Sequence, residues 1–391
     1  MSINEDTKTI FEDDNEYVAG TYARFKIAIK DGKGAKLYDY EGKEYIDCAT
    51  GIGVNIFGVN DEAWKRAVKE QIDSVQHVCN LYYSQPQTRL AKLLCEKTGA
   101  KKVFFCNSGA EANECAIKVA RKYGNDRYGD RNEIITLKNS FHGRTVATIS
   151  ATGQDGFHKH FYPFLQGFKY ADATMEGITS CYTDKTCAVM VEVIQGEGGV
   201  NPLDLTFLNE LEKFCKDRDI LLICDEVQCG NGRTGYLYAY ESAGISPDIV
   251  TTAKGLGGGL PIGACLLFDK CCSTLRAGDH GSTFGGNPVA CAGACSIIER
   301  LDRDMLLEVQ GKGAYFNAHL QHIKNVTGVS GMGLMIGIST TKNSREIATK
   351  CLEKGLIVLT AHDKVRLLPP LTITKEEINT ALKILNEVIS E

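Results

Sequence analysis

Short apolar runs of strand length alternate with amphipathic helical segments between residues 103 and 224. The apolar runs occupy residues 103–106, 133–137, 188–194 and 220–224, and helical spacing of apolar residues fills 108–123 and 205–218. This alternation predicts an α/β fold, in which a mostly parallel sheet is covered by helices on both faces. Ligands of such sheets bind at the carboxyl ends of the strands. Asp225 directly follows the run at 220–224, so we expect it at that edge.

The pattern changes after Pro288, which predicts a second, smaller α+β domain. A helical stretch over about 289–323 is followed by a glycine-rich segment, two strand-like runs at 355–359 and 364–368, and a final helix from Lys375. With 391 residues the chain is long enough for two or three domains. We expect an N-terminal segment, 1–55, that packs with the small domain, a large domain, 56–288, and the small domain, 289–391.

An early helix is predicted after Asn60 or Asp61, either of which is a suitable N-cap. Apolar residues recur with helical spacing from Trp64 to Val78.

Charge and hydropathy exclude several classes of protein. The net charge is −5 and no basic stripe is visible, which argues against a nucleic-acid partner. No apolar run approaches the roughly 20 residues that a membrane helix needs. The segment up to Tyr17 is rich in acidic residues and lacks the cationic and apolar regions of a signal peptide.

The sixteen cysteines show no pattern typical of a metal or disulfide framework. No Cys-x-x-Cys motif is present, and no cysteines and histidines cluster at metal-ligand spacing. Cys224 and Cys265 lie in apolar runs, as buried thiols do. We therefore expect no metal site and reduced, unpaired cysteines, which indicates a cytoplasmic protein.

Lys254 and Asp225 together predict a site for pyridoxal 5′-phosphate (PLP). Lys254 stands before the glycine-rich segment 255–259, and Asp225 ends an apolar run. PLP needs a lysine that forms a Schiff base with its aldehyde. It also needs an acid that pairs with its protonated pyridine nitrogen and keeps the ring an electron sink.

A nucleotide site is a weaker interpretation of the same glycines. Residues 255–260 lack the sixth-position glycine of a dinucleotide fingerprint, and the chain has no Gly-Lys-Ser/Thr of a P-loop. A non-catalytic PLP-binding protein on this fold is a further alternative, disfavoured because Lys254, Asp225 and candidate carboxylate clamps are all present.

Two segments that follow predicted strands supply further candidates. In residues 105–114 (FCNSGAEANE), Ser108 is an N-cap, and the small Gly109 and Ala110 let a phosphate approach the helix N-terminus. In residues 140–145 (SFHGRT), Phe141 is placed to stack on the cofactor ring, and Arg144 to clamp a substrate carboxylate. The alternatives are an ordinary capped helix, and a core phenylalanine beside a surface arginine.

Two more segments are polar and rich in glycine. Residues 192–199 (EVIQGEGG) end a strand in a loop that carries acids, and 281–288 (GSTFGGNP) offers hydroxyls for a phosphate or is a plain surface loop. Gln228, three residues after Asp225, is a candidate for a hydrogen bond to the ring hydroxyl.

Taken together, these segments resemble the class III PLP-dependent aminotransferases from about Tyr22 to the C-terminus. Residues 21–25 (TYARF), 80–87 (NLYYSQPQ) and 365–374 (VRLLPPLTIT) resemble the subfamily that acts on N2-acetylornithine in arginine biosynthesis. The resemblance implies fold type I. The chain departs from the family at 57–63 (FGVNDEA), where Gly-His-x-His-Pro is frequent, but no role assigned to a residue depends on those histidines.

The resemblance implies a role for each candidate residue. Lys254 is the catalytic lysine, and Asp225 pairs with the pyridine nitrogen. The remaining cofactor contacts are implied for Ser108, Gly109, Ala110, Phe141, Gln228 and Thr283. Thr283 acts on the other subunit's site, which implies a homodimer with shared active sites. Substrate contacts are implied for Tyr22, Arg144, Glu197, Ser282 and Arg366.

The implied reaction moves the terminal amino group of N2-acetylornithine to 2-oxoglutarate. Tyr22 and Arg144 bind the donor's far end, and Arg366 binds the carboxylate beside the reacting amine of glutamate. Because the terminal amine has no such carboxylate, we expect Glu197 to neutralise Arg366 in that half-reaction.

Other amino donors stay open, namely ornithine, succinylornithine, 4-aminobutyrate and lysine-pathway amines, because apolar pockets discriminate weakly. A PLP mutase or decarboxylase on the same fold is also open, although it would not need both Arg144 and Arg366.

Overall fold

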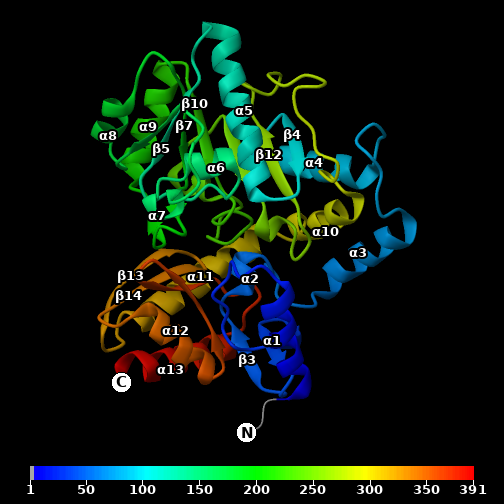
Figure 1. Ribbon diagram of the computed structural model, residues 1–391, viewed down its shortest axis with the longest axis vertical. Helices are drawn as coiled ribbons and strands as arrows, with labels where there is room; N and C mark the ends of the chain where they lie inside the picture. The colour runs from blue at the N-terminus through cyan, green and yellow to red at the C-terminus, as the bar shows by residue number, and fades with distance from the viewer. Residues whose placement is uncertain (1–3) are drawn as a thin grey trace.

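A seven-stranded sheet forms the upper part of the computed structural model in Figure 1, which describes residues 4–391. Its strand order is β4-β12-β11-β10-β7-β5-β6. The strands are β4 (Lys102–Cys106), β5 (Glu133–Leu137), β6 (Phe168–Ala171), β7 (Thr186–Val191), β10 (Leu221–Asp225), β11 (Ile249–Thr252) and β12 (Gly263–Leu267). Only β12 runs antiparallel to its neighbours. The predicted α/β fold with a mostly parallel sheet is confirmed.

Helices bury both faces of this sheet, because successive strand residues point to opposite sides. On one face, Leu221 and Ile223 share a buried cluster with apolar residues of α5 (Gly109–Tyr128). On the other face, Leu222 and Cys224 share a cluster with residues of α9 (Leu205–Asp217). The fully buried β10 thus delivers Asp225 to the sheet edge from a rigid support.

Further helices surround the sheet. They are α3 (Glu62–Ser74), α4 (Gln85–Thr98), α6 (Val146–Ala151), α7 (Asp155–His158), α8 (Met175–Cys181) and α10 (Pro288–Ile298). Helix α10 packs against both α3 and α4, which lie on the right of Figure 1. None of the helices within residues 4–391 is long and apolar enough to cross a membrane.

Two four-stranded sheets lie in the lower part of Figure 1. One contains β1 (Ile29–Lys33), β2 (Lys36–Asp39), β3 (Glu44–Asp47) and β15 (Leu356–Ile357); the other contains β13 (Val326–Met332), β14 (Met335–Thr340), β17 (Lys364–Leu367) and β16 (Leu359–Ala361). The helices of this part are α1 (Glu5–Tyr17), α2 (Thr50–Gly53), α11 (Arg303–Leu320), α12 (Ser344–Glu353) and α13 (Lys375–Ser390).

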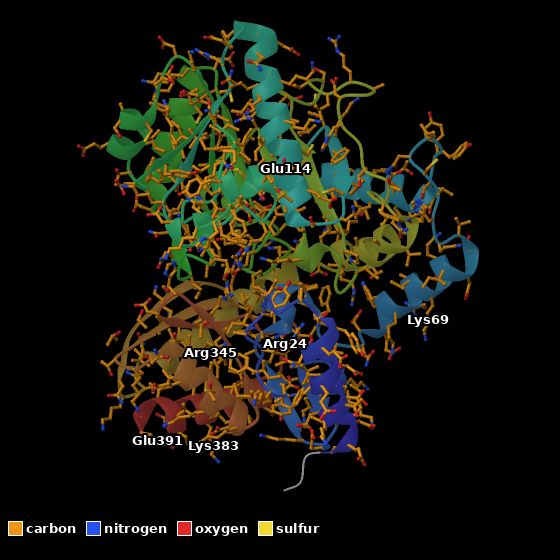
Figure 2. All side chains as sticks on the ribbon, in the orientation of Figure 1. Arg24, Lys69, Glu114, Arg345, Lys383 and Glu391 are labelled. Carbon is orange, nitrogen blue, oxygen red and sulfur yellow. The ribbon has the colours of Figure 1, made fainter. Side chains whose placement is uncertain are left out.

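The N-terminal segment is bound to the C-terminal part of the chain. Strand β3 pairs in parallel with β15. Figure 2 labels Arg24 and Arg345, and the Arg345 guanidinium donates to the Ala23 carbonyl oxygen at 3.0 Å and lies over the Phe25 ring. The domain limits at residues 55 and 288 remain a prediction, and residues 1–3 of the first segment lie outside the described part.

Several elements differ from their predicted limits, and the run predicted at 355–359 is divided between β15 and β16, which belong to different sheets. The long helix over 289–323 is two helices, because Asp302 caps α11 by accepting from the Met305 amide. The early helix is capped by Asp61 but ends at Ser74, and Val75 is extended. The run 188–194 leaves the sheet after Val191, and its last residue lies in a short strand, β8 (Ile194–Gln195), paired with β9 (Asn201–Pro202).

Candidate active site

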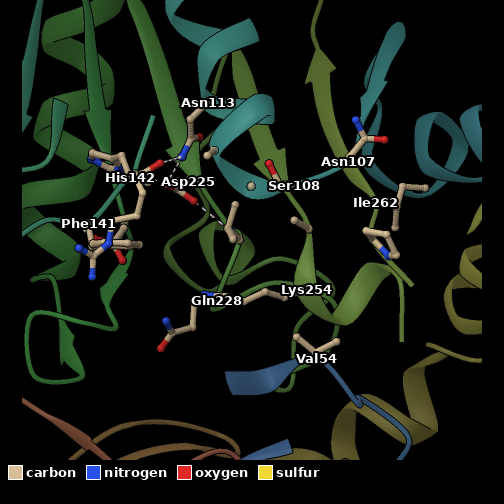
Figure 3. Close-up of a pocket in the computed structure, with 18 of the residues that line it drawn as sticks. Val54, Asn107, Ser108, Asn113, Phe141, His142, Asp225, Gln228, Lys254 and Ile262 are labelled. Carbon is tan, nitrogen blue, oxygen red and sulfur yellow. Dashed lines mark hydrogen bonds and ion pairs between the residues drawn. The ribbon is translucent and has the colours of Figure 1, made fainter. Parts of the chain in front are cut away.

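A cavity of about 460 Å³ lies at the carboxyl edge of the large sheet, shown in Figure 3. It is lined by residues that directly follow β4, β5, β10 and β11, together with residues 259–262 before the antiparallel β12. Eight of the predicted residues line it: Ser108, Gly109, Ala110, Phe141, Arg144, Asp225, Gln228 and Lys254.

Asp225 lies at the bottom of the cavity as a buried, fully hydrogen-bonded carboxylate. Its Oδ2 accepts from Asn113 Nδ2 at 2.7 Å and faces His142 Nδ1 at 2.8 Å, while Oδ1 accepts from the Val227 amide at 3.0 Å. Asn113 is itself fixed, since its Oδ1 accepts from the Thr251 hydroxyl at 2.6 Å. These contacts fix the orientation of the Asp225 carboxylate.

Asn113 and His142 had no predicted role. Both lie in segments with predicted site residues: Asn113 is one turn into α5, and His142 follows Phe141. The sequence of these segments does not indicate that either side chain faces Asp225. His142 is buried, and its Nε2 has no hydrogen-bond partner within the described chain.

Lys254 projects into the cavity immediately after β11. Its φ is 47°, in the left-handed region that a non-glycine residue rarely adopts, which is typical of functional sites. Burial is the main influence that lowers the pKa of the Lys254 amine, and the nearby Arg366 lowers it further. The amine therefore loses its proton more readily than a lysine in water.

The N-terminus of α5 forms one wall of the cavity. Ser108 caps the helix, because its Oγ accepts from the Glu111 amide at 3.2 Å. Gly109 lies so close to Val227 that an added Cβ would stand 2.6 Å from a valine methyl group. Only glycine fits there, and it leaves the helix amides open to an anion.

Phe141 and Arg144 lie on the loop after β5. The Phe141 amide donates to Glu192 Oε1 at 2.8 Å, and the Gly196 amide donates to Glu192 Oε2 at 3.2 Å. Glu192, which had no predicted role, thus ties this loop to the loop after β7, and burial raises its pKa to about 7. Arg144 is exposed, with its guanidinium over the rings of Phe157 and Phe141.

Glu197, Gln228 and Arg366 form a hydrogen-bonded group beside the cavity. Arg366 Nη1 donates to Glu197 Oε1 at 2.6 Å and to Gln228 Oε1 at 2.9 Å, and Gln228 Nε2 donates to Glu197 Oε1 at 3.1 Å. Burial alone would raise the pKa of Glu197, but the charge and hydrogen bond of Arg366 outweigh it, so that pKa is lowered. The expected contact between Glu197 and Arg366 is therefore present.

Five predicted residues are absent from the cavity lining; Glu197 and Arg366 lie beside it, and the other three are Tyr22, Thr283 and Ser282. Tyr22 is 72% exposed, with Arg24 stacked over its ring. Thr283 is also exposed. The Ser282 hydroxyl accepts from Asn107 Nδ2 at 3.2 Å, and Asn107 is itself a lining residue.

The chain belongs to the class III aminotransferases, because the family model described as "Aminotransferase class-III" matches residues 17–389. Among curated proteins, it is 49% identical to the acetylornithine aminotransferase of Haemophilus ducreyi, over 97% of this chain and 98% of that protein. It is 45% identical to the acetylornithine aminotransferase of Caldanaerobacter subterraneus, over the same shares of the two chains.

Solved structures agree with this assignment. The ornithine aminotransferase of Toxoplasma gondii superposes with a TM-score of 0.94 at 30% identity, covering 98% of this chain and 94% of that one. A second structure of that enzyme has partial occupancy of PLP at its active site. The N-acetylornithine aminotransferase of Stenotrophomonas maltophilia has a TM-score of 0.83 at 35% identity, covering 96% and 97%.

PLP is the cofactor, and the cavity fits it at each end. A buried carboxylate held by two side-chain donors suits a protonated ring nitrogen, and the open N-terminus of α5 suits a phosphate. Lys254, whose amine has a pKa lowered by burial, lies in the same cavity.

Proposed function

We propose that this protein transfers the terminal amino group of N2-acetylornithine to 2-oxoglutarate, giving N-acetylglutamate 5-semialdehyde and glutamate. Relatives named acetylornithine aminotransferase are 43–49% identical over 97% of the chain. The observation that carries the proposal is the ion pair between Arg366 and Glu197, together with an Arg144 that lines the cavity and has no carboxylate partner within residues 4–391. This arrangement suits two substrates that place their carboxylates differently.

Different residues of the cavity would bind different parts of the cofactor. When bound, PLP supplies an electron sink that weakens the C–H bond at the amine-bearing carbon. Asp225 would pair with the protonated ring nitrogen, because contacts with Asn113 and His142 hold its carboxylate in a fixed orientation. Ser108 and the following amides would hold the phosphate, and Phe141 would stack on the ring.

Lys254 moves the proton. Burial lowers the pKa of its amine, which favours the neutral form that a general base needs. With PLP bound, the amine would take up the proton lost from the amine-bearing carbon of the substrate and would hold it for the second proton transfer. Lys254 stands two residues after the buried strand β11, which holds it at the cavity.

Glu197 lets one site accept two kinds of substrate. In the half-reaction with the terminal amine, Glu197 stays on Arg366 and no buried charge is left uncompensated. Glutamate or 2-oxoglutarate instead presents its own carboxylate to Arg366 and displaces Glu197, whose side chain is 27% exposed and has room to turn toward solvent. Arg144 binds the remote carboxylate of N2-acetylornithine, and Tyr22 contacts the same end.

A second copy of the chain completes the site. Thr283 is exposed and away from the cavity of its own subunit, which supports a role at the partner's phosphate. Large apolar side chains are exposed on the neighbouring segments, among them Leu81, Tyr82, Tyr83 and Phe284. Such a patch favours a homodimer. The sixteen free cysteines, most of them buried, support a reducing compartment such as the cytoplasm.

Ornithine is the second candidate donor, because the T. gondii ornithine aminotransferase superposes with a TM-score of 0.94. Visible absorption of the purified holoenzyme distinguishes the two. Addition of N2-acetylornithine without a keto acid should remove the band of the lysine-bound cofactor, and 2-oxoglutarate should restore it. A band that responds to ornithine or 4-aminobutyrate but not to N2-acetylornithine would refute the proposed donor.

A further inference from the structure

Two arginines near the cavity differ in their contacts: one is paired with a carboxylate, and the other is packed on aromatic rings. Arg366 is buried and paired with a carboxylate at 2.6 Å. Arg144 makes no hydrogen bond or ion pair within residues 4–391, and its Cζ lies 4.2 Å from the centroid of the Phe157 ring and 5.6 Å from that of Phe141. An aromatic face attracts a guanidinium without neutralising its charge. Arg144 is thus held in place but keeps its full charge for a ligand.

Phe157 reaches Arg144 from a separate element, α7. Its ring meets the edge of Phe141 at a centroid distance of 5.4 Å and an angle of 61°. The segment before α7 is fastened to the loop that carries Phe141. The Gly153 amide donates to the Ser140 hydroxyl, and Gln154 Nε2 donates to the Ser140 carbonyl, both at 3.0 Å. The position of Phe157 relative to the Arg144 loop is therefore fixed by the fold.

We propose that Phe157 is a positioning residue that makes the enzyme prefer amino donors with a carboxylate remote from the reacting amine. With one face of its guanidinium on Phe157, Arg144 has few rotamers left and keeps its N–H edges for a bidentate contact with a carboxylate. Loss of the ring leaves a long, exposed side chain that must be ordered each time a donor binds. This inference rests on the proposed function, since it assigns the remote carboxylate to Arg144.

The test compares two donors that differ only in the carboxylate. N-acetylputrescine has the acetamido group, the chain length and the terminal amine of N2-acetylornithine but no carboxylate. In the holoenzyme of Phe157→Leu, kcat/KM for N2-acetylornithine should fall roughly three- to thirtyfold, the range of a cation–π contact. The loss should lie mainly in KM, and kcat/KM for N-acetylputrescine, which lacks the remote carboxylate, should stay within about twofold of wild type.

Three further variants keep the inference falsifiable. Phe157→Tyr should restore the preference, because the ring face returns. Phe161→Leu removes a 62% exposed aromatic residue of the same region and should leave the preference unchanged. In an Arg144→Met background, Phe157→Leu should have no further effect on N2-acetylornithine.

Equal losses with the two acetylated donors, or an unchanged preference in Phe157→Leu, would overturn the inference and leave the proposed function intact. Failure of the wild-type protein to use N2-acetylornithine at all would overturn both.

Discussion

Replacement of Glu197 by alanine should damage one half-reaction far more than the other. In the wild-type protein, Arg366 is 3% exposed and donates to Glu197 and to the neutral Gln228 through the same nitrogen, while its Nε has no partner within residues 4–391. Without Glu197 this cation keeps a single neutral acceptor. Glutamate supplies a carboxylate in its place, whereas N2-acetylornithine supplies none at that position.

The magnitude follows from the burial of the pair. Removal of one partner from a fully buried ion pair costs about 3–5 kcal/mol. Because the Glu197 side chain is 27% exposed, water screens part of this, and we expect about 1.5–3 kcal/mol. Both donors react with the same free enzyme, so any change in the free energy of that enzyme cancels when their kcat/KM values are divided. The ratio of kcat/KM for glutamate to that for N2-acetylornithine should therefore rise roughly 10- to 150-fold.

Single-turnover absorbance of the bound cofactor measures each half-reaction separately. Glu197→Gln keeps the size and an acceptor but not the charge, so it should shift the ratio in the same direction as alanine. Glu299→Gln breaks the more exposed ion pair with Arg89 and should leave the ratio unchanged. Equal losses in the two half-reactions of Glu197→Ala would refute the argument that Glu197 acts by neutralising Arg366.

Three further outcomes are expected. Lys254→Ala should retain PLP through dialysis while turnover falls at least about a thousandfold, and measurable transamination would remove Lys254 as the base. If Thr283 serves the partner's site, subunit exchange between inactive Lys254→Ala and weakened Thr283→Ala should give more activity than either variant alone. In each mixed dimer, one site then has both an intact Lys254 and an intact Thr283. No gain in activity would argue against shared sites. Burial raises the pKa of Glu226 to about 7 from an ordinary value of 4.5, so the stability from this group is full below pH 4.5 and is lost as pH rises to about 7. Glu226→Gln should make the fall in unfolding free energy between about pH 5 and 7 shallower by about 1.4 kcal/mol per pH unit, measured by urea denaturation; parallel profiles would contradict the raised pKa.

Local signals in the sequence predicted much of the fold. Strand β5 has its predicted limits, and β4 and β10 differ from theirs by one residue or two. Ser108 caps α5, and Thr374 caps α13 with a capping box, because a hydroxyl at such a position satisfies helix amides wherever the helix lies. The break before α11 also has a local cause in Asp302, but continuous apolar spacing across it predicted a single helix.

The order and direction of strands had no such local signal. Strand β12 lies between β4 and β11 and runs against both, although its apolar sequence is compatible with either direction. The direction matters for the site, because the start of β12 places residues 259–262 at the same edge as the ends of the parallel strands. Strand pairing depends on contacts between residues far apart in the chain, which no window of sequence contains.

The surroundings of Asp225 mark the limit of inference from sequence. A carboxylate at the end of a buried strand must have donors, since an unpaired buried charge costs several kcal/mol. That requirement predicts that donors exist but not which residues they are. They come from α5 and from the loop after β5, and Asn113 is oriented in turn by Thr251 at the end of β11. Lys254 and Asp225 were recognisable as candidates because a lysine before a glycine-rich segment and an acid ending a buried strand are rare in sequence. Common residues such as Asn113 and Thr251 acquire their contacts only from the fold.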